Sequence, residues 1–188
     1  MSTKKVNTRA LYIGMVLLIL IAMSFVFFVN TNKGTSQSLP TVDMHFDLVE
    51  KFDSVEELYE KSNIIAQVKV GNTNTIEYGN VAFTLSNVEI IKVFKGDLDK
   101  KSTISILETG GTHDGLIYRA EGNAVFTKSD QAIVYLEKYE GPIADNSYVI
   151  KGVYQGKFKV NGEKITPPNE VDGNIESVKS IKDLKLHP

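Results

Sequence analysis

A histidine and an aspartate lie side by side in a glycine-rich stretch, residues 110–115. His113 and Asp114 would place an imidazole next to a carboxylate, and the flanking glycines would let the backbone approach a ligand closely. We therefore expect a mobile loop with His113 and Asp114 as candidate binding residues, since loops often carry function. A solvated loop without a ligand is the alternative. The stretch lacks the Gly-Lys-Ser/Thr ending of phosphate-binding loops, so nucleotide hydrolysis is not indicated.

A second candidate is the alternating set Asp43, His45 and Asp47. In an extended segment all three side chains would point to one side and could ligate a metal, while Phe46 would be buried opposite. The alternative is a strand that simply leads into the domain. The sequence has three histidines and no His-Glu-x-x-His pair, so zinc hydrolysis is not indicated. We assign no metal site and no cofactor.

Aromatic residues recur on segments that we expect to be strands. Tyr148 and Tyr154, with Phe158 beyond them, could form a stacking platform for a sugar or a peptide. Packing in the core is the alternative use of the same side chains. Tyr148 and Tyr154 complete our candidate binding residues. We assign no catalytic residue, because no Gly-x-Ser-x-Gly turn is present and the chain has no cysteine.

The elements that position these residues begin with an N-terminal membrane segment. Residues 11–29 are nineteen consecutive uncharged residues, enough to nearly span a hydrocarbon core of ~30 Å at ~1.5 Å per residue. Lys4, Lys5 and Arg9 precede the segment, so we expect residues 1–10 to be a cytoplasmic tail. The chain would then be a single-pass protein of the cell membrane with an extracytoplasmic C-terminal domain. A cleaved signal peptide is the alternative, but a small-residue cleavage site is missing.

Charge restricts the partners of the outer part. Residues 30–188 carry 18 basic and 23 acidic residues, a net charge of −5. This balance argues against nucleic acid as a partner. We expect a protein or cell-wall partner, in addition to the membrane contact through residues 11–29.

Hydrophobic periodicity divides the outer part into a spacer, a short helix and several strands. Residues 30–42 lack apolar periodicity and are interpreted as a flexible spacer. Ser54 has the spacing of a helix cap before a short helix. From Ile64 the period becomes two, with β-branched residues dominant. The apolar phase changes between Leu85 and Val88, which predicts a β-bulge near Ser86–Asn87.

The C-terminal third predicts further strands and one hairpin. Asn161-Gly162 separates two strand-like runs, and both residues of such a pair accept positive φ. Residues 167–188 form a separate segment, possible as a short helix. The expected fold is therefore mainly β: a small OB-like β-barrel over residues 43–166 with one short helix before its first strand. A two-sheet sandwich is the alternative.

The strand pattern resembles a known group of domains. The runs are Asn63–Val70, Phe83–Asp97, Asp130–Leu136 and Gly156–Val160. They are similar to bacterial membrane-anchored surface domains of uncharacterised function, which in turn resemble the netrin and metalloproteinase-inhibitor OB-like barrel. The resemblance covers roughly residues 54–165 and implies a fold. Those inhibitors chelate zinc through an N-terminal cysteine, which this chain lacks, so their mechanism is not implied.

A second resemblance supplies the enzyme alternative. Residues 36–41 and 148–151 are similar to the serine and lysine boxes of type I signal peptidases, which also join an N-terminal anchor to an external β domain. Ser38 and Lys151 would be the catalytic pair. The Met-x-Pro that follows the family's serine is missing, and Gly152 and Gln155 replace residues around its lysine. We therefore expect a binding domain, with the Ser-Lys peptidase as the alternative.

Overall fold

The computed structural model describes residues 38–186. Leu39–Pro188 form one compact unit. The unit is mainly β with one short α-helix before the long strands, which confirms the coarse prediction. The expected tail (1–10), membrane helix (11–29) and most of the spacer lie outside the described residues. Within residues 38–186 no helix has the length and apolar character needed to cross a membrane.

The elements follow one another along the chain with short connections. In order they are β1 (Thr41–Met44), α2 (Val55–Lys61), β2 (Ile64–Tyr78), β3 (Val81–Lys95), β4 (Thr103–Thr109), β5 (Gly111–His113), β6 (Leu116–Ala120), β7 (Gln131–Lys138), β8 (Ser147–Ile150), β9 (Lys157–Asn161), β10 (Lys164–Thr166) and a 3-10 helix, η1 (Ile181–Leu184). β1 begins inside the expected spacer, because it pairs in parallel with β6.

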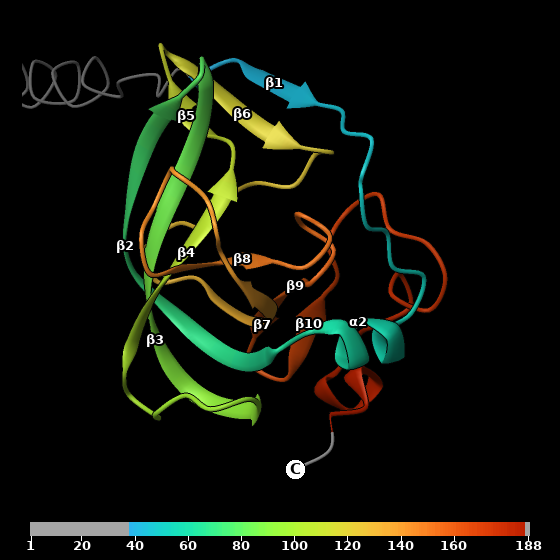
Figure 1. The fold of residues 1–188 in the computed structure, drawn as a ribbon. Helices are drawn as coiled ribbons and strands as arrows, with labels where there is room; N and C mark the ends of the chain where they lie inside the picture. The colour runs from blue at the N-terminus through green and yellow to red at the C-terminus, as the bar shows by residue number, and fades with distance from the viewer. Residues whose placement is uncertain (1–37, 187–188) are drawn as a thin grey trace, which may run out of the picture. The chain divides into compact units, whose positions relative to one another are not determined.

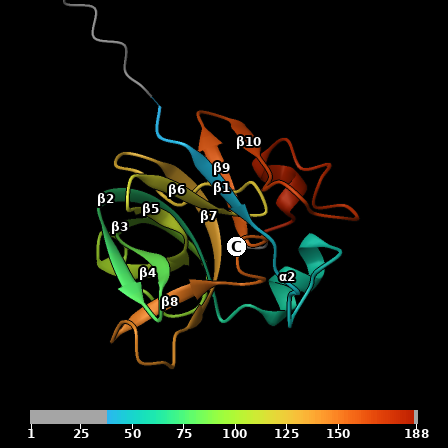
Figure 2. The same ribbon diagram turned by 90° about the horizontal axis from the view of Figure 1, so that it is seen from above.

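Five strands are linked into a ring. The larger sheet has the order β10-β9-β7-β2-β3-β4-β8, and β8 pairs again with β7. β7, β2, β3, β4 and β8 therefore follow one another around the ring, as Figures 1 and 2 show. Only the β4–β8 pairing is parallel within it. A smaller sheet of order β1-β6-β5 lies at one end of the long β2–β3 hairpin (Figure 1).

Two cores lie on the two faces of the ring wall. All five ring strands contribute to the inner core, which also contains Phe126. β7 is buried on both faces: Val134 belongs to the inner core, while Ile133 and Tyr135 belong to the outer core with α2 and the C-terminal segment. β2 likewise buries Ile64, Ala66, Val68 and Val70 on one face, as the period of two predicted.

The predicted bulge lies on the wrong strand. The residue without a cross-strand partner at this level is Gly71 of β2, between the pairs Val70–Val88 and Asn72–Asn87. β3 itself pairs continuously with β4 from Phe83 to Glu89. Its buried side chains keep one phase throughout, since small residues occupy the inner face at Ala82, Thr84 and Ser86. The more apolar side chains of this half of β3 therefore lie on the outer face, which sequence periodicity alone did not reveal.

The short helix and the C-terminal segment close the outer core. Ser54 caps α2 by accepting a hydrogen bond from the Glu57 backbone N–H at 3.1 Å, as its spacing predicted. Residues 167–186 pack onto the same core rather than forming a separate body, with four buried apolar side chains: Val171, Ile175, Val178 and Leu184. The β9–β10 hairpin exists as predicted, but its turn residues are Gly162 and Glu163, and only Gly162 has positive φ.

Candidate functional site

The glycine-rich stretch is a β-hairpin, not the loop that we expected. β5 and β6 pair antiparallel, with His113 opposite Leu116 and a tight turn at Asp114 and Gly115. The glycine at 111 serves packing, because a Cβ there would overlap the hydroxyl oxygen of Thr84. The prediction of a mobile loop was therefore wrong, since close strand packing accounts for this glycine.

The candidate pair in this hairpin lies next to a carboxylate of β2. His113 Nε2 is 3.5 Å from Glu77 Oε2 and 3.5 Å from Asp114 Oδ2. The Asp114 side chain is 84% exposed, and the His113 side chain is 29% exposed. The two residues thus lie together at a hairpin tip, where a ligand role for them stays a prediction.

Tyr148 and Tyr154 do not form one platform. Tyr148 lies on β8 beside the inner core, with the Lys138 ammonium 4.8 Å from its ring centre. Tyr154 is buried in the outer core and donates a hydrogen bond to the Glu170 carbonyl at 3.1 Å. Burial raises the pKa of the Tyr154 hydroxyl. Phe158 is fully buried against the ring of Tyr135, so these aromatic side chains mainly pack the two cores.

The alternating acidic set does not converge on one point. β1 ends at Met44, and His45 turns its Nδ1 to Glu121 Oε2 at 2.8 Å. The other oxygen of Glu121 accepts a hydrogen bond from the Phe46 backbone N–H, also at 2.8 Å. Among residues 38–186 no group of three potential ligands could hold a metal ion. Here the histidine and glutamate fasten the chain that follows β1.

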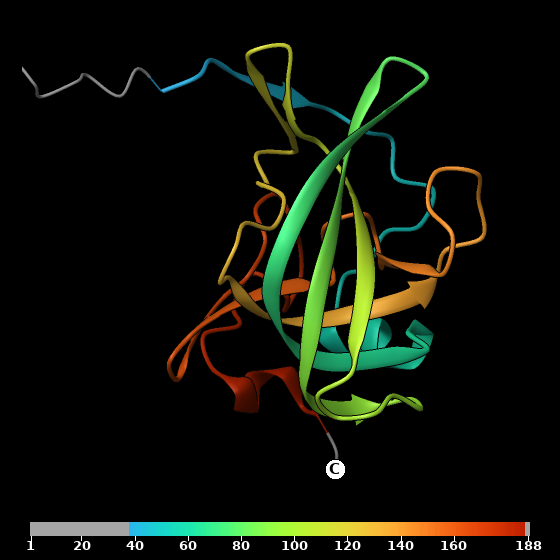
Figure 3. The same cartoon turned by 90° about the vertical axis from the view of Figure 1, so that its left-hand side faces the viewer.

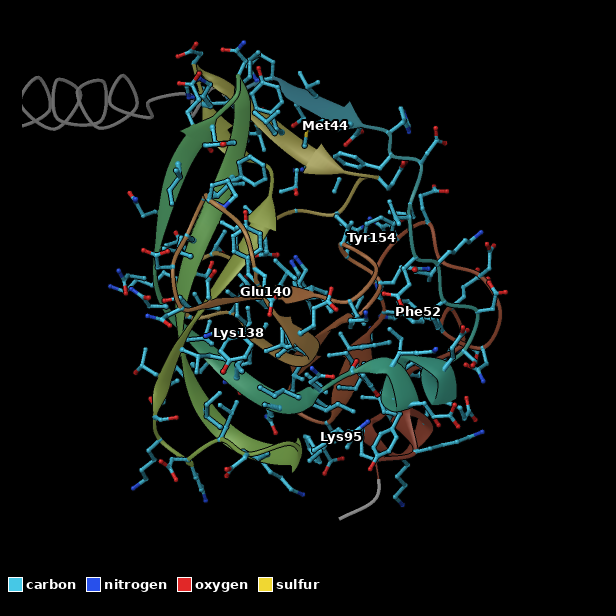
Figure 4. The ribbon with its side chains drawn as sticks, viewed as in Figure 1. Met44, Phe52, Lys95, Lys138, Glu140 and Tyr154 are labelled. Carbon is cyan, nitrogen blue, oxygen red and sulfur yellow. The ribbon has the colours of Figure 1, made fainter. Side chains whose placement is uncertain are left out.

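That chain, residues 45–53, connects β1 to α2 without regular structure, and we call it the strap. Figure 4 shows its beginning at Met44 and its end at Phe52, on the same side of the molecule as Tyr154. Gln155 holds the Phe52 end with two backbone hydrogen bonds, of 3.0 and 3.1 Å. The strap is therefore fixed at both ends against the ring.

Lys151 lies beneath the strap in a carboxylate clamp. Its ammonium donates hydrogen bonds to Glu50 of the strap and to Glu137 of β7, the latter at 2.9 Å. Burial works to lower the pKa of Lys151, but the hydrogen bonds to the two carboxylates outweigh it, so the pKa is raised. An amine that acts as a base must be neutral, which needs the opposite shift. This geometry does not favour the peptidase alternative.

A hollow of about 420 Å³ opens between the strap and the ring. Its lining comes from segments far apart in sequence: Phe46–Glu50, Leu107, Thr109, Glu137, Tyr139, Val149, Ile150, Gly152 and Val153. Most of these side chains are apolar, and the charged ones, Asp47, Glu50 and Glu137, are all acidic. The hollow is thus an apolar depression with an acidic rim.

Two exposed valines border the hollow. Val49 is fully exposed, and Val153 is 39% exposed. Val153 also has φ of +62°, a conformation that a β-branched residue adopts only under strain. Strained backbone of this kind concentrates at functional sites. The position of Val153 therefore adds to the case for the hollow.

An apolar face leads from the hollow across the ring wall. Cross-strand pairs link Leu85 to Leu107 and Leu107 to Val149, which lines the hollow. Further toward the hairpin tip, the pairs Ile76–Phe83 and Tyr78–Val81 continue the same face. We call this set the outer apolar face: Ile76, Tyr78, Val81, Phe83 and Leu85, with Leu107 and Val149. The five hairpin residues pack in neither core, and Figure 3 shows the face of β2, β3 and β4 uncovered by other elements.

A second buried ion pair is structural. Lys157 of β9 and Glu108 of β4 have side chains only 5% and 4% exposed. Lys157 also donates to the Ala124 carbonyl at 2.8 Å, and Glu108 accepts from the Phe126 backbone N–H at 2.9 Å. The pair therefore holds the connection between β6 and β7 against the ring and faces no hollow that we identify.

Sequence reasoning missed the hollow and the outer apolar face. No family model, curated protein sequence or solved structure matches the chain. The function therefore has to be argued from the geometry of the chain itself.

Proposed function

We propose that the chain is a single-pass membrane protein whose extracytoplasmic domain is an OB-like barrel that binds a protein partner. The partner would cover the outer apolar face and insert side chains into the adjoining hollow. Residues 11–29 would anchor the protein in the cell membrane with the N-terminus in the cytoplasm.

The strand ring supports the OB-like assignment. An OB barrel has five strands in a Greek-key order and commonly binds ligands on the face of its second and third strands. In this chain those strands correspond to β3 and β4, counting β2 as the first ring strand. The loop between the fourth and fifth ring strands contributes Tyr139 to the hollow, as the ligand-binding loops of that fold do.

The observation that carries the proposal is the continuity of the outer apolar face with the hollow. A soluble domain rarely leaves a contiguous apolar surface without a use, and such surfaces mark interaction sites. The acidic rim adds chemistry: a partner segment with apolar side chains next to a lysine or arginine would match both features. No observation favours a second function.

Photo-crosslinking in intact cells tests the proposal. A photoreactive phenylalanine analogue would replace Val153 in the hollow of the full chain, and in a matched control it would replace Val42 of β1. The two valines are 39% and 38% exposed, so chance collisions should be equal. We expect a discrete adduct from position 153 and none from position 42. Equal adducts from both positions, or none from 153, would refute the proposal.

A further inference from the structure

Half of β2 has an unpaired edge. β2 pairs with β7 only over Ile64–Lys69, and Val70 then exchanges backbone hydrogen bonds of 2.8 and 2.9 Å with residues 129–130. Beyond the bulge at Gly71, residues 71–78 pair with β3 alone among the described strands. All eight are exposed except the half-buried Ile76. This leaves about 26 Å of open strand at ~3.3 Å per residue.

The open edge has few of the devices that normally prevent strand addition. Proteins protect exposed edges with lysine, proline, inward charges or covering segments. Residues 71–78 contain neither lysine nor proline, and Glu77 is their only charged residue. Figure 3 shows this part of β2 as the outer border of the long hairpin. The edge is therefore available for backbone pairing with another strand.

The sequence of the edge is complementary to itself. Thr73-Asn74-Thr75 reads the same in both directions. We propose that two copies of this chain pair through residues 71–78 of β2, antiparallel and centred on Asn74. Each Thr73 then lies opposite Thr75 of the second copy, a pairing in which the hydroxyls can hydrogen-bond. A twofold axis at Asn74 makes the interface isologous, the commonest arrangement in homodimers.

Charge favours this antiparallel register over the parallel one. In the antiparallel register Glu77 lies opposite Gly71 of the second copy, so the two Glu77 carboxylates are separated by six residues, about 20 Å. That separation exceeds the screening length of ~8 Å at physiological salt. A parallel in-register pairing would instead place the two Glu77 carboxylates next to each other.

The pairing would join two seven-stranded sheets into one. Because the twofold axis is perpendicular to the sheet, the outer apolar faces of both copies lie on the same side. Two binding faces held side by side would raise the avidity for a multivalent partner. The pairing itself does not depend on that partner and is measured in its absence.

Disulfide capture tests the pairing and its register. The chain has no cysteine, so single substitutions report one contact each. In the full chain under mild oxidation, Asn74→Cys should form a disulfide-linked dimer because the two positions face each other. Asn72→Cys, on the same face of the same strand, should give at least tenfold less, because its equivalent lies about 13 Å away along the strand. Mixed Thr73→Cys and Thr75→Cys chains should cross-link with each other more than either does alone.

A second variant separates pairing from random collision. Thr75→Lys in the Asn74→Cys chain should lower the dimer yield at least tenfold, whereas Thr103→Lys on β4 should leave it unchanged. Equal cross-linking at positions 72 and 74, or no dimer at either, would overturn the proposal. A dimer that Thr75→Lys does not weaken would overturn it as well.

Discussion

Removing one partner of the Lys157–Glu108 pair should cost far more stability than removing a cation whose partners reach water. Lys157→Met keeps most of the aliphatic stem but leaves the Glu108 carboxylate, 4% exposed, without its cation. Breaking a buried pair in this way typically costs about 3–5 kcal/mol, because the remaining charge is uncompensated. With a urea m-value of about 2 kcal/mol/M, the unfolding midpoint would fall by roughly 2 M.

Lys151→Met is the matched control. The Lys151 side chain is nearly as buried as that of Lys157, 6% against 5% exposed, but its partners Glu50 and Glu137 are 45% and 43% exposed. Those carboxylates regain water when the ammonium is removed. The loss should therefore stay below about 1–2 kcal/mol, nearer to that of a surface pair.

Urea unfolding of residues 39–188, which contain both cores, supplies the free energies. Glu108→Gln keeps an acceptor for the Phe126 backbone N–H and completes a double-mutant cycle with Lys157→Met. We expect the double variant to be more stable than the sum of the single losses predicts, with a coupling of about 2 kcal/mol. A Lys157→Met loss no larger than that of Lys151→Met, or a coupling near zero, would refute the reasoning.

Three further predictions concern backbone strain and one ion pair. Gly173→Ala should cost several times more than Gly79→Ala in urea unfolding: both glycines have positive φ, but only at 173 would the Cβ overlap a backbone carbonyl of the strap. Equal losses would contradict this. A hydrogen bond from Lys185, with others, lowers the pKa of Glu56 to about 2. Lys185→Ala should therefore cost under about 1 kcal/mol at pH 7, and the loss should vanish as the pH falls from about 4 through 2; a loss that grows in acid would have the wrong sign. Val153→Gly should raise stability by about 1 kcal/mol by relieving the positive φ, while reducing partner binding; destabilisation would show that the turn is not strained.

Local pattern predicted the strands because their physics is local. The alternation of Ile64, Ala66, Val68 and Val70 fixed one buried face, and the structure places all four in the inner core. The phase change after Leu85 was misread, because small inward residues on β3 and the bulge at Gly71 in the partner strand produce the same pattern. A single strand's sequence does not show which strand of a pair carries the extra residue.

The candidate site was harder to predict because it has no local signature. The hollow combines strap residues near Phe46 with Leu107, Glu137 and Val153, which only the ring topology brings together. The sequence marked His113 instead, since glycine near histidine is typical of ligand loops as well as of tight strand packing. A lysine at a strand end likewise does not reveal the carboxylates that will surround it.

The central claim is that the outer apolar face and the hollow form one binding surface. Capture by the photoreactive residue at position 153 should be measured in chains that also carry Phe83→Asp, or Val42→Asp as the control. Phe83 lies on the outer apolar face and in neither core, so the charge should disturb binding rather than folding. We predict at least a tenfold loss of the adduct with Phe83→Asp and none with Val42→Asp. An undiminished adduct with Phe83→Asp would contradict the account.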